Sequence, residues 1–409
     1  MSEKRNVPAI RFAGFTDAWE QRKVGAIASF AKGTGYSKAD ICKSGTPLIL
    51  YGRLYTKYET VIHEVDTYAV PRAGSVYSHG GEVIVPASGE TAEDISIASV
   101  VEKAGILLGG DLNIIIPDEA VDPTFLALTL SHGKAHNELS KLAQGKSVVH
   151  IHNTDIQSVE IQFPSIAEQV VLSNLFVRIE TLITLHQRKY DQLIRVKKAM
   201  LEKMFPKGDA RVPEIRFSGF TDAWEQRKLG DIAEIVGGGT PSTSNSSYWD
   251  GDIDWYAPAE MEGQRYAVGS ARKITIAGLQ HSSAKILPAE KTVLFTSRAG
   301  IGKMAILKRP GATNQGFQSL ILKAGYNPYF IYSMGGEIKA KAEGVASGST
   351  FLEISGKMLG NIEIAIPTET EQDAIAACFE HLDDLITLHQ RQLEKLKKIK
   401  AAMLERMFV

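Results

Sequence analysis

Two shortages limit what this chain of 409 residues can be. It has only two cysteines, Cys42 and Cys378, which are too few for a disulfide framework or a cysteine-rich zinc site and fit a reducing cytoplasm. It also has no apolar run near the ~20 residues that a membrane span needs, and its first residues lack the apolar region of a secretory signal. We therefore expect a cytoplasmic protein with neither disulfides nor membrane segments.

The chain also lacks an excess of charge of one sign. Lys and Arg number 46 against 47 Asp and Glu, a formal net charge of −1. The basic balance that many nucleic-acid-binding domains show is missing, although a local patch or a basic partner could supply the field. Charge alone therefore does not decide the class of function. At about 150 residues per domain, the length favours two or three domains.

What the chain does have is an internal repeat. The string RFAGFTDAWEQRK at Arg11–Lys23 returns as RFSGFTDAWEQRK at Arg216–Lys228, 205 positions later. The wider stretches Val7–Ala28 and Val212–Ala233 differ at four positions. Solenoids need three or more short repeats, so this pattern indicates a two-fold duplication instead.

A second pair of matching segments lies further along each half. Val159–Pro206 aligns with Ile362–Val409, and both contain LITLHQR and AMLE. The stretches between the matching segments differ strongly, which gives a constant–variable–constant plan written twice. Constant parts typically form a shared scaffold or bind a shared partner, whereas divergent centres suggest two ligands of one class.

The second constant segment predicts a long helix in each half. Residues 167–205 contain neither Pro nor Gly, and apolar residues recur at spacings of three and four, which is heptad patterning. We expect the two helices to pair with each other as an intramolecular antiparallel coiled coil with pseudo-two-fold symmetry. The predicted seam consists of Leu175, Ile179, Leu182, His186, Leu193, Val196 and Met200 in the first helix and Leu382, Leu385, His389, Leu396, Ile399 and Met403 in the second.

The variable centres predict two globular domains of mixed α/β or α+β class. Strand-like runs such as EVIVPAS and LNIIIP alternate with Gly-rich loops. Asp122-Pro123 and Asn327-Pro328 each predict a helix start, with an N-cap followed by Pro at the first helical position. In the repeated segment, Asp17 with Glu20 resembles a capping pair that opens a short turn. The expected boundaries are 1–165 for the first domain, 166–208 for the central helix, 209–368 for the second domain and 369–409 for the last helix.

Several short motifs suggest enzymes or metal sites but lack their context. GKS at Gly145–Ser147 resembles a P-loop, yet Ser140 stands where that loop needs glycine. GGGT at Gly237 is followed by no dinucleotide-binding fingerprint, and NPYF at Asn327 resembles a methyltransferase tetrad but is better explained as a helix start. HIH at His150–His152 has no evident third ligand. We find no nucleophile–base pair and no PD-(D/E)xK nuclease core, so we expect no free-standing enzyme and no bound metal.

In combination, these features resemble the specificity subunit of type I restriction–modification enzymes. The similarity rests on the GFTDAWEQRKLGDI entry, the loops GGGTPSTSNSSYWDGDIDWYAP and TSRAGIGK, and the long LITLHQR helix. A hinge of Pro followed by Glu-Gln occurs in both halves, at Pro164 with Glu168-Gln169 and at Pro367 with Glu371-Gln372. The similarity covers essentially the whole chain, and the order of the motifs, present twice, is more specific than any one of them.

The resemblance implies a role in host defence as a non-catalytic DNA-binding subunit. Two target recognition domains would each read half of a bipartite gapped site in double-stranded DNA, and the helices would set the spacer. Two modification subunits would bring S-adenosylmethionine and methylate adenine, and restriction subunits would use ATP and Mg. This chain would hold no cofactor.

Candidate DNA contacts are polar loop side chains of the kinds that bind phosphates and base edges. In the first domain they are Lys32, Thr34, Tyr36, Lys38, Arg53, Tyr55, Ser88, Lys146 and Ser147. In the second domain they are Thr240, Ser242, Tyr248, Trp255, Ser297, Arg298, Lys303, Gln315 and Gln318. Two other hypotheses stay open on the sequence: a coiled-coil interaction protein with two carbohydrate- or peptide-binding heads, and a self-contained methyltransferase.

Overall fold

The structure, a computed structural model, describes residues 7–145, 148–208, 210–298, 300–347 and 352–408. The chain divides into two compact units that each combine separate stretches of sequence. Unit 1 consists of Met1–Arg188 with Gln390–Val409, and unit 2 of Lys189–His389. We use "head" for the globular part of a unit without its long-helix segments.

Unit 1 is built around a five-stranded sheet in the order β2-β10-β6-β8-β4. All neighbours are antiparallel except the parallel pair β8 and β4. The strands span Ala28–Lys32 (β2), Leu112–Pro117 (β10), Glu82–Pro86 (β6), Ser99–Val101 (β8) and Val61–Ile62 (β4). Helix α3 (Pro123–Ser131) packs on β6 and β8. Asp122 caps it by accepting a hydrogen bond from Phe125 N (2.8 Å), which confirms the predicted helix start.

Smaller sheets and helices complete the first head. They are the sheet β5-β3-β9 (Tyr68–Ala69, Thr46–Ile49, Leu107–Leu108), the pair β11-β7 (Val149–His150, Ser88–Gly89), the pair β1-β12 (Glu20–Lys23, Glu160–Phe163), and helices α1 (Gly52–Thr56), α2 (Ala92–Ile95), α4 (Gly133–Leu142) and α5 (Asn153–Ser158). The expected cap at Asp17 and Glu20 was wrong, because Glu20 begins the extended strand β1 and pairs with Phe163.

Unit 2 repeats this plan with different details. Its five-stranded sheet has the order β14-β21-β18-β19-β16 (Ala233–Gly237, Gln318–Leu322, Thr292–Phe295, Met304–Leu307, Tyr266–Ala267). Beside it lie the sheet β17-β15-β20 (Arg272–Ile274, Trp249–Tyr256, Gly311–Thr313), the pair β13-β22 (Glu225–Lys228, Glu363–Ile366), and helices α7 (Leu229–Ile232), α8 (Ile276–Gln280), α9 (Pro328–Ser333), α10 (Gly335–Val345) and α11 (Gly356–Gly360). Asn327 caps α9 through Tyr329 N and Phe330 N, as predicted. The mixed α/β class expected for both heads is confirmed.

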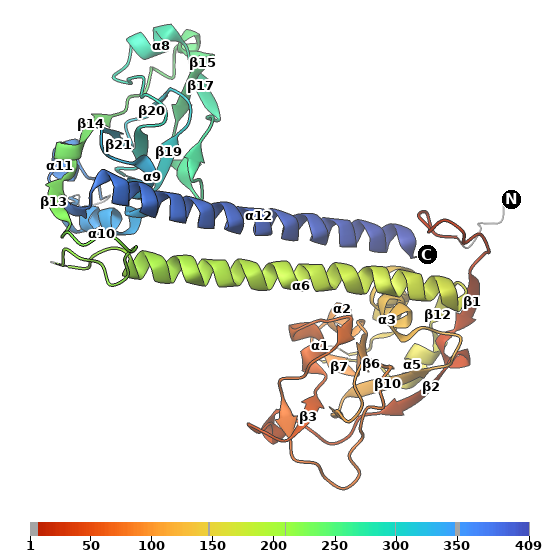
Figure 1. Cartoon of the computed structure of the whole chain (residues 1–409). Coiled ribbons are helices and arrows are strands. Elements are labelled where there is room, and N and C mark those ends of the chain that lie inside the picture. The colour runs from red at the N-terminus through yellow and green to blue at the C-terminus, as the bar shows by residue number, and fades with distance from the viewer. Residues whose placement is uncertain (1–6, 146–147, 209, 299, 348–351, 409) are drawn as a thin grey trace. The chain divides into compact units, whose positions relative to one another are not determined.

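The two long helices are α6 (Ile166–Lys203) and α12 (Glu369–Met407) (Figure 1). Each unit contains a segment of both. In unit 2, Lys197 contacts Asp383, while Phe205, just beyond α6, meets Phe379 near the start of α12. The residue numbers thus rise along one helix as they fall along the other. The same holds for α6 and α12 in unit 1, so the expected antiparallel pairing is present in both units.

A stripe of buried and half-buried positions on each helix follows a regular heptad. It comprises Leu172, Phe176, Ile179, Ile183, His186, Tyr190, Leu193, Lys197 and Met200 along α6 with Met204 just beyond its end, and Ile375, Phe379, Leu382, Ile386, His389, Leu393, Leu396, Lys400, Met403 and Met407 along α12. Eight of the predicted seam residues lie on this stripe: Ile179, His186, Leu193, Met200, Leu382, His389, Leu396 and Met403.

Five other predicted seam residues lie one position before the stripe, namely Leu175, Leu182, Val196, Leu385 and Ile399. The exposed fraction is 45% for Leu182, 40% for Val196 and 38% for Ile399. The shift has a simple cause. Where two apolar residues are adjacent, as at Leu182 and Ile183, the heptad pattern can be assigned to either. Beside Val196 and Ile399 the stripe position is a lysine, so the apolar neighbour was selected instead.

A cluster of four aromatic rings closes the core of each unit. In unit 1, Phe408 stacks on Phe125 (ring centroids 5.5 Å apart) and meets Phe176 (5.6 Å), while Trp19 packs edge-on against Phe125. Trp224, Phe330, Phe379 and Phe205 form the equivalent cluster in unit 2. The end of α12 therefore completes the core of unit 1, and the end of α6 completes that of unit 2.

Candidate nucleic-acid interface

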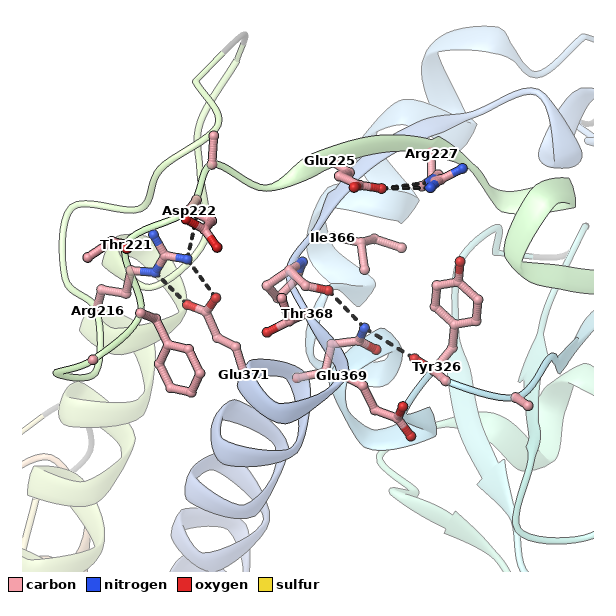
Figure 2. A pocket seen from close by; sticks show the side chains of 17 residues that line it. Arg216, Thr221, Asp222, Glu225, Arg227, Tyr326, Ile366, Thr368, Glu369 and Glu371 are labelled. Atoms are coloured by element: carbon pink, nitrogen blue, oxygen red, sulfur yellow. Dashed lines mark hydrogen bonds and ion pairs between the residues drawn. The ribbon is translucent and has the colours of Figure 1, made fainter.

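The repeated segment RF(A/S)GFTDAWEQRK forms the scaffold on which each head stands. In unit 2, Arg216 makes two hydrogen bonds of 2.7 Å to the carboxylate of Glu371, in the first turn of α12 (Figure 2). Glu371 is 1% exposed, so this charge is buried and paired. In unit 1, Arg11 holds Glu168 of α6 in the same way, at 2.6 and 2.7 Å.

The glutamine of each Glu-Gln hinge connects a long helix to the head by hydrogen bonds. Gln372 donates to Pro367 O (3.1 Å) and accepts from the backbone N–H of Asn327 (3.1 Å), which ties the start of α12 to the start of α9. Gln169 makes the same links in unit 1, to Pro164 O and from Asp122 N. Both hinge residues are therefore structural, and they fix the first turn of a long helix against a helix of the head.

The scaffold also receives the end of the other long helix. The backbone N–H of Ile10 donates to Arg406 O (3.0 Å), and that of Ile215 to Lys203 O (2.9 Å). Each copy of the repeated segment is thus bonded to the start of one long helix and the end of the other. This accounts for the duplication of the segment, since each head needs its own copy.

Three loops of the second head, which follow the strands β14, β18 and β20, come together. Gly239 N donates to Thr313 O (2.9 Å), Ser297 N donates to Gly316 O (2.8 Å), and Thr240 donates to the amide oxygen of Gln315. A side chain at Gly238 would meet Asn314 O at 1.9 Å, so only glycine allows this close approach. The structure therefore brings the motifs GGGTPST, TSR and NQGF into one region, with some of their side chains exposed and others buried.

The predicted contact residues in this region differ in exposure. Ser242 and Gln315 are exposed, and Thr240, Tyr248, Arg298, Lys303 and Gln318 are half-buried. Trp255 and Ser297 are buried, and the indole N–H of Trp255 donates to Gly239 O (2.9 Å). These two side chains would reach DNA only if the loops over them rearranged. Their buried positions indicate that they support the loops instead.

The structure reveals one cation here that the sequence analysis did not select. Arg272 of β17 lies over the ring of Trp249 at 3.7 Å and near Trp255 at 5.7 Å. Its side chain is exposed, and among the described residues it has no carboxylate within salt-bridge distance. A guanidinium held flat on indole rings keeps its donors free and oriented. The aromatic residues in WDGDIDWY were visible in the sequence, but the pairing of β17 with β15 was not.

In the first head, four predicted residues line one cleft of ≈ 810 Å³: Tyr36, Lys38, Arg53 and Tyr55. Lys38 is exposed. Arg53 is held by Glu59 and Asp66, both at 2.7 Å, so its guanidinium is already paired. Burial, followed by the nearby Tyr51, raises the pKa of Tyr55, which therefore stays a neutral donor. The cleft thus combines aromatic side chains with an exposed lysine, Lys38.

Lys32, Thr34 and Ser88, also predicted in the first head, are not among the residues that line this cleft. Lys32 is exposed at the end of β2. The Thr34 hydroxyl accepts from Val76 N and donates to Gly74 O, both at 3.3 Å. Ser88 is buried in β7. Lys146 and Ser147 fall outside the described residues.

In the part of the chain that the structure describes, no group of three or more His, Cys, Asp or Glu side chains is arranged to hold a metal ion. The rings of His150 and His152 stack with centroids 6.5 Å apart, and no third His, Cys, Asp or Glu among the described residues forms a metal-binding group with them. No described helix has the length and apolar character needed to span a bilayer.

Comparison with known proteins defines the class of the chain. Residues 16–195 and 221–398 match the family described as the type I restriction modification DNA specificity domain. The two matches cover most of the chain, which therefore belongs to this family and carries its domain twice. The resemblance noted in the sequence is confirmed.

Individual relatives are consistent with this class. The chain is 38% identical over 191 residues to the type I restriction enzyme MjaIX specificity subunit of Methanocaldococcus jannaschii, an alignment that spans 46% of this chain and 44% of that relative. It is 24% identical over 401 residues to the putative MjaX specificity subunit of the same organism, covering 95% and 87% of the two chains. The fold is similar to that of the type I restriction–modification S subunit from M. genitalium (TM-score 0.64, 14% identity, 98% and 99% coverage).

Proposed function

We propose that this chain is the sequence-reading subunit of a type I restriction–modification complex. Each head reads one half of a bipartite, gapped site in double-stranded DNA. One observation carries the proposal: the two heads stand on duplicated scaffolds, with the same Arg–Glu pair and aromatic cluster, yet present different loops. One scaffold with two sets of loops suits one class of ligand with two different sequences.

The proposed division of labour follows the duplication. The heads, residues 1–165 and 209–368, read bases, and the helical segments 166–208 and 369–409 hold the heads at a fixed spacing. In the second head, base or phosphate contacts come from the exposed residues of the three joined loops and from Arg272. In the first head they come from the cleft around Lys38 and Tyr55. Arg and Lys suit guanine and phosphate, whereas Gln suits adenine.

Partner subunits supply the chemistry in this proposal. Two modification subunits carry S-adenosylmethionine and methylate adenine, restriction subunits use ATP and Mg, and this chain catalyses nothing. A surface that occurs twice suits two copies of one partner. The pocket in Figure 2, ≈ 380 Å³ in volume, is lined by part of the repeated segment, Gly219–Ala223, and the sequence writes the same five residue types at positions 14–18. The complex would act in the cytoplasm, where the DNA is, in host defence.

The test is to map adenine methylation in cells that express this chain with its modification subunits. We expect a gapped, two-part motif that disappears when the gene is removed. Replacing the loop residues 238–249 of the second head with those of a relative should change one half of the motif and leave the other half unchanged. A change in both halves, or methylation without a gapped motif, would contradict the proposal.

A further inference from the structure

A polar contact joins the first head to both long helices. The carboxylate of Glu180, on α6, accepts at its Oε1 atom from the hydroxyl of Thr60 (2.6 Å) and from the ammonium group of Lys400, on α12 (2.6 Å). Thr60 is fully buried, and about four-fifths of the surface of the Glu180 and Lys400 side chains is shielded from solvent. We call Thr60, Glu180 and Lys400 the unit 1 anchor.

Unit 2 contains a contact of the same design. Asp383, on α12, accepts from the hydroxyl of Tyr329 in the second head (2.7 Å) and from Lys197, on α6 (2.5 Å). Burial, followed by the hydrogen bond to Asp383, raises the pKa of Tyr329, so its hydroxyl stays a donor. Arg265 of the same head adds a bond to the neighbouring Asp384 (2.5 Å). We call Tyr329, Asp383 and Lys197 the unit 2 anchor.

The helix members of the two anchors are equivalent in the repeat, but the head members are not. Glu180 corresponds to Asp383, and Lys197 to Lys400, in the aligned helices. Thr60 precedes β4, whereas Tyr329 lies in α9. Two divergent heads therefore make the same connection to a shared acid–lysine pair by different routes.

The lysines stand at stripe positions of the helix pair, where an apolar residue would be the more stable choice. The stripe thus contains a lysine in each helix, Lys197 and Lys400, at matched places. Apolar packing is non-directional, whereas a charge-assisted hydrogen bond fixes distance and direction. In each anchor the acidic residue and the lysine lie on different long helices. The contact therefore connects the head to both helices rather than to one.

We propose that the two anchors are positioning devices that fix the pose of each head on its helix pair, and thereby the spacer length at which the two half-sites are bound. The inference rests on the proposed DNA-reading function and goes beyond it. A head with a loosened pose presents its loops over a wider range of positions. The difference in affinity between a site with the correct spacer and a site with a shifted spacer then becomes smaller.

The experiment uses the full chain assembled with its modification subunits. Affinity is measured for duplexes that carry the mapped half-sites at the mapped spacer, or at a spacer one base pair longer or shorter. We expect Lys400→Met to reduce the preference for the correct spacer by about three- to ten-fold, since the coupling in a partly buried ion pair lies between that of exposed and buried pairs. The base preference within each half-site should not change. Lys400→Arg, which keeps a charged donor, should restore most of the preference.

Lys398→Met provides the matched control, because Lys398 is exposed on the same helix. If Lys400→Met lowers affinity for all three duplexes by one common factor, the anchor only stabilises the fold and the inference is wrong. Lys197→Met tests the second anchor independently, should the first variant not fold. If the parent complex binds no gapped site, the proposed function fails together with the inference. If it binds such sites but neither variant changes the spacer preference, only the inference fails.

Discussion

Replacing Phe408 with alanine should destabilise unit 1, although residue 408 lies far from most of that unit in sequence. Phe408 is 8% exposed, and its ring contacts Phe125 and Phe176 at centroid distances of 5.5 and 5.6 Å. Phe205→Ala is the matched variant, because Phe205 has the equivalent place in unit 2. Each substitution should therefore act on the unit whose core the ring completes.

The size of the effect follows from burial. A phenylalanine buries roughly 150–250 Å², and at about 25 cal/mol per Å² the transfer contribution reaches roughly 4–6 kcal/mol. Alanine retains part of that contribution, and measured Phe→Ala changes in cores are about 3–5 kcal/mol. We expect a loss of about 3–5 kcal/mol in the free energy of unfolding of unit 1, and little change in unit 2.

Hydrogen exchange followed by mass spectrometry on the intact chain resolves the two units. Phe408→Ala should reduce protection in β6 and β10 of unit 1 and leave β18 and β21 of unit 2 nearly unchanged. Phe205→Ala should give the reverse pattern. If Phe408→Ala weakens both units equally, or mainly unit 2, the assignment of this ring to the core of unit 1 is refuted.

Three further results are expected. Arg11→Met should lower the free energy of unfolding by about 3–5 kcal/mol, because it leaves the buried carboxylate of Glu168 unpaired. Arg22→Met, at an exposed pair, should lower it by less than about 1 kcal/mol. Urea titration measures both changes. Burial, with Lys400 nearby, lowers the pKa of His132 from 6.5 to about 4. Between about pH 4 and 6.5 the unfolded state binds this proton more than the folded state does, so the free energy of unfolding should be lower by about 2 kcal/mol at pH 5 than at neutral pH, and this decrease should be smaller in His132→Gln. Arg272→Met should weaken cognate DNA binding in the assembled complex by about 1–3 kcal/mol, and an unchanged affinity would remove Arg272 from the interface.

Features with a local cause could be predicted from the sequence. The two helix starts at Asp122 and Asn327 follow from an N-cap and a proline in adjacent positions, and both are observed. The long helices follow from a period of 3.5 residues that extends over many turns. The two-fold plan follows from the repeat itself.

Features that depend on distant partners could not be predicted. Nothing near Phe408 in the sequence indicates that its ring packs against Phe125. Lys197 and Lys400 resemble solvent-facing cations until their acidic partners, Asp383 and Glu180, are known. Trp255 stands in a polar loop segment that suggested the surface, yet tertiary packing buries it.

The placement of α12 in the core of unit 1 has a consequence for the order of events during synthesis. A ribosome makes residues 1–188, then residues 189–389, and only then the segment that completes unit 1. At about 5–20 residues per second, this delay lasts roughly 10–40 s. Throughout that interval, Trp19, Phe125 and Phe176 lack their fourth ring. The half that is made first is therefore completed last, and a chain interrupted before residue 400 leaves an apolar gap that chaperones or proteases can recognise.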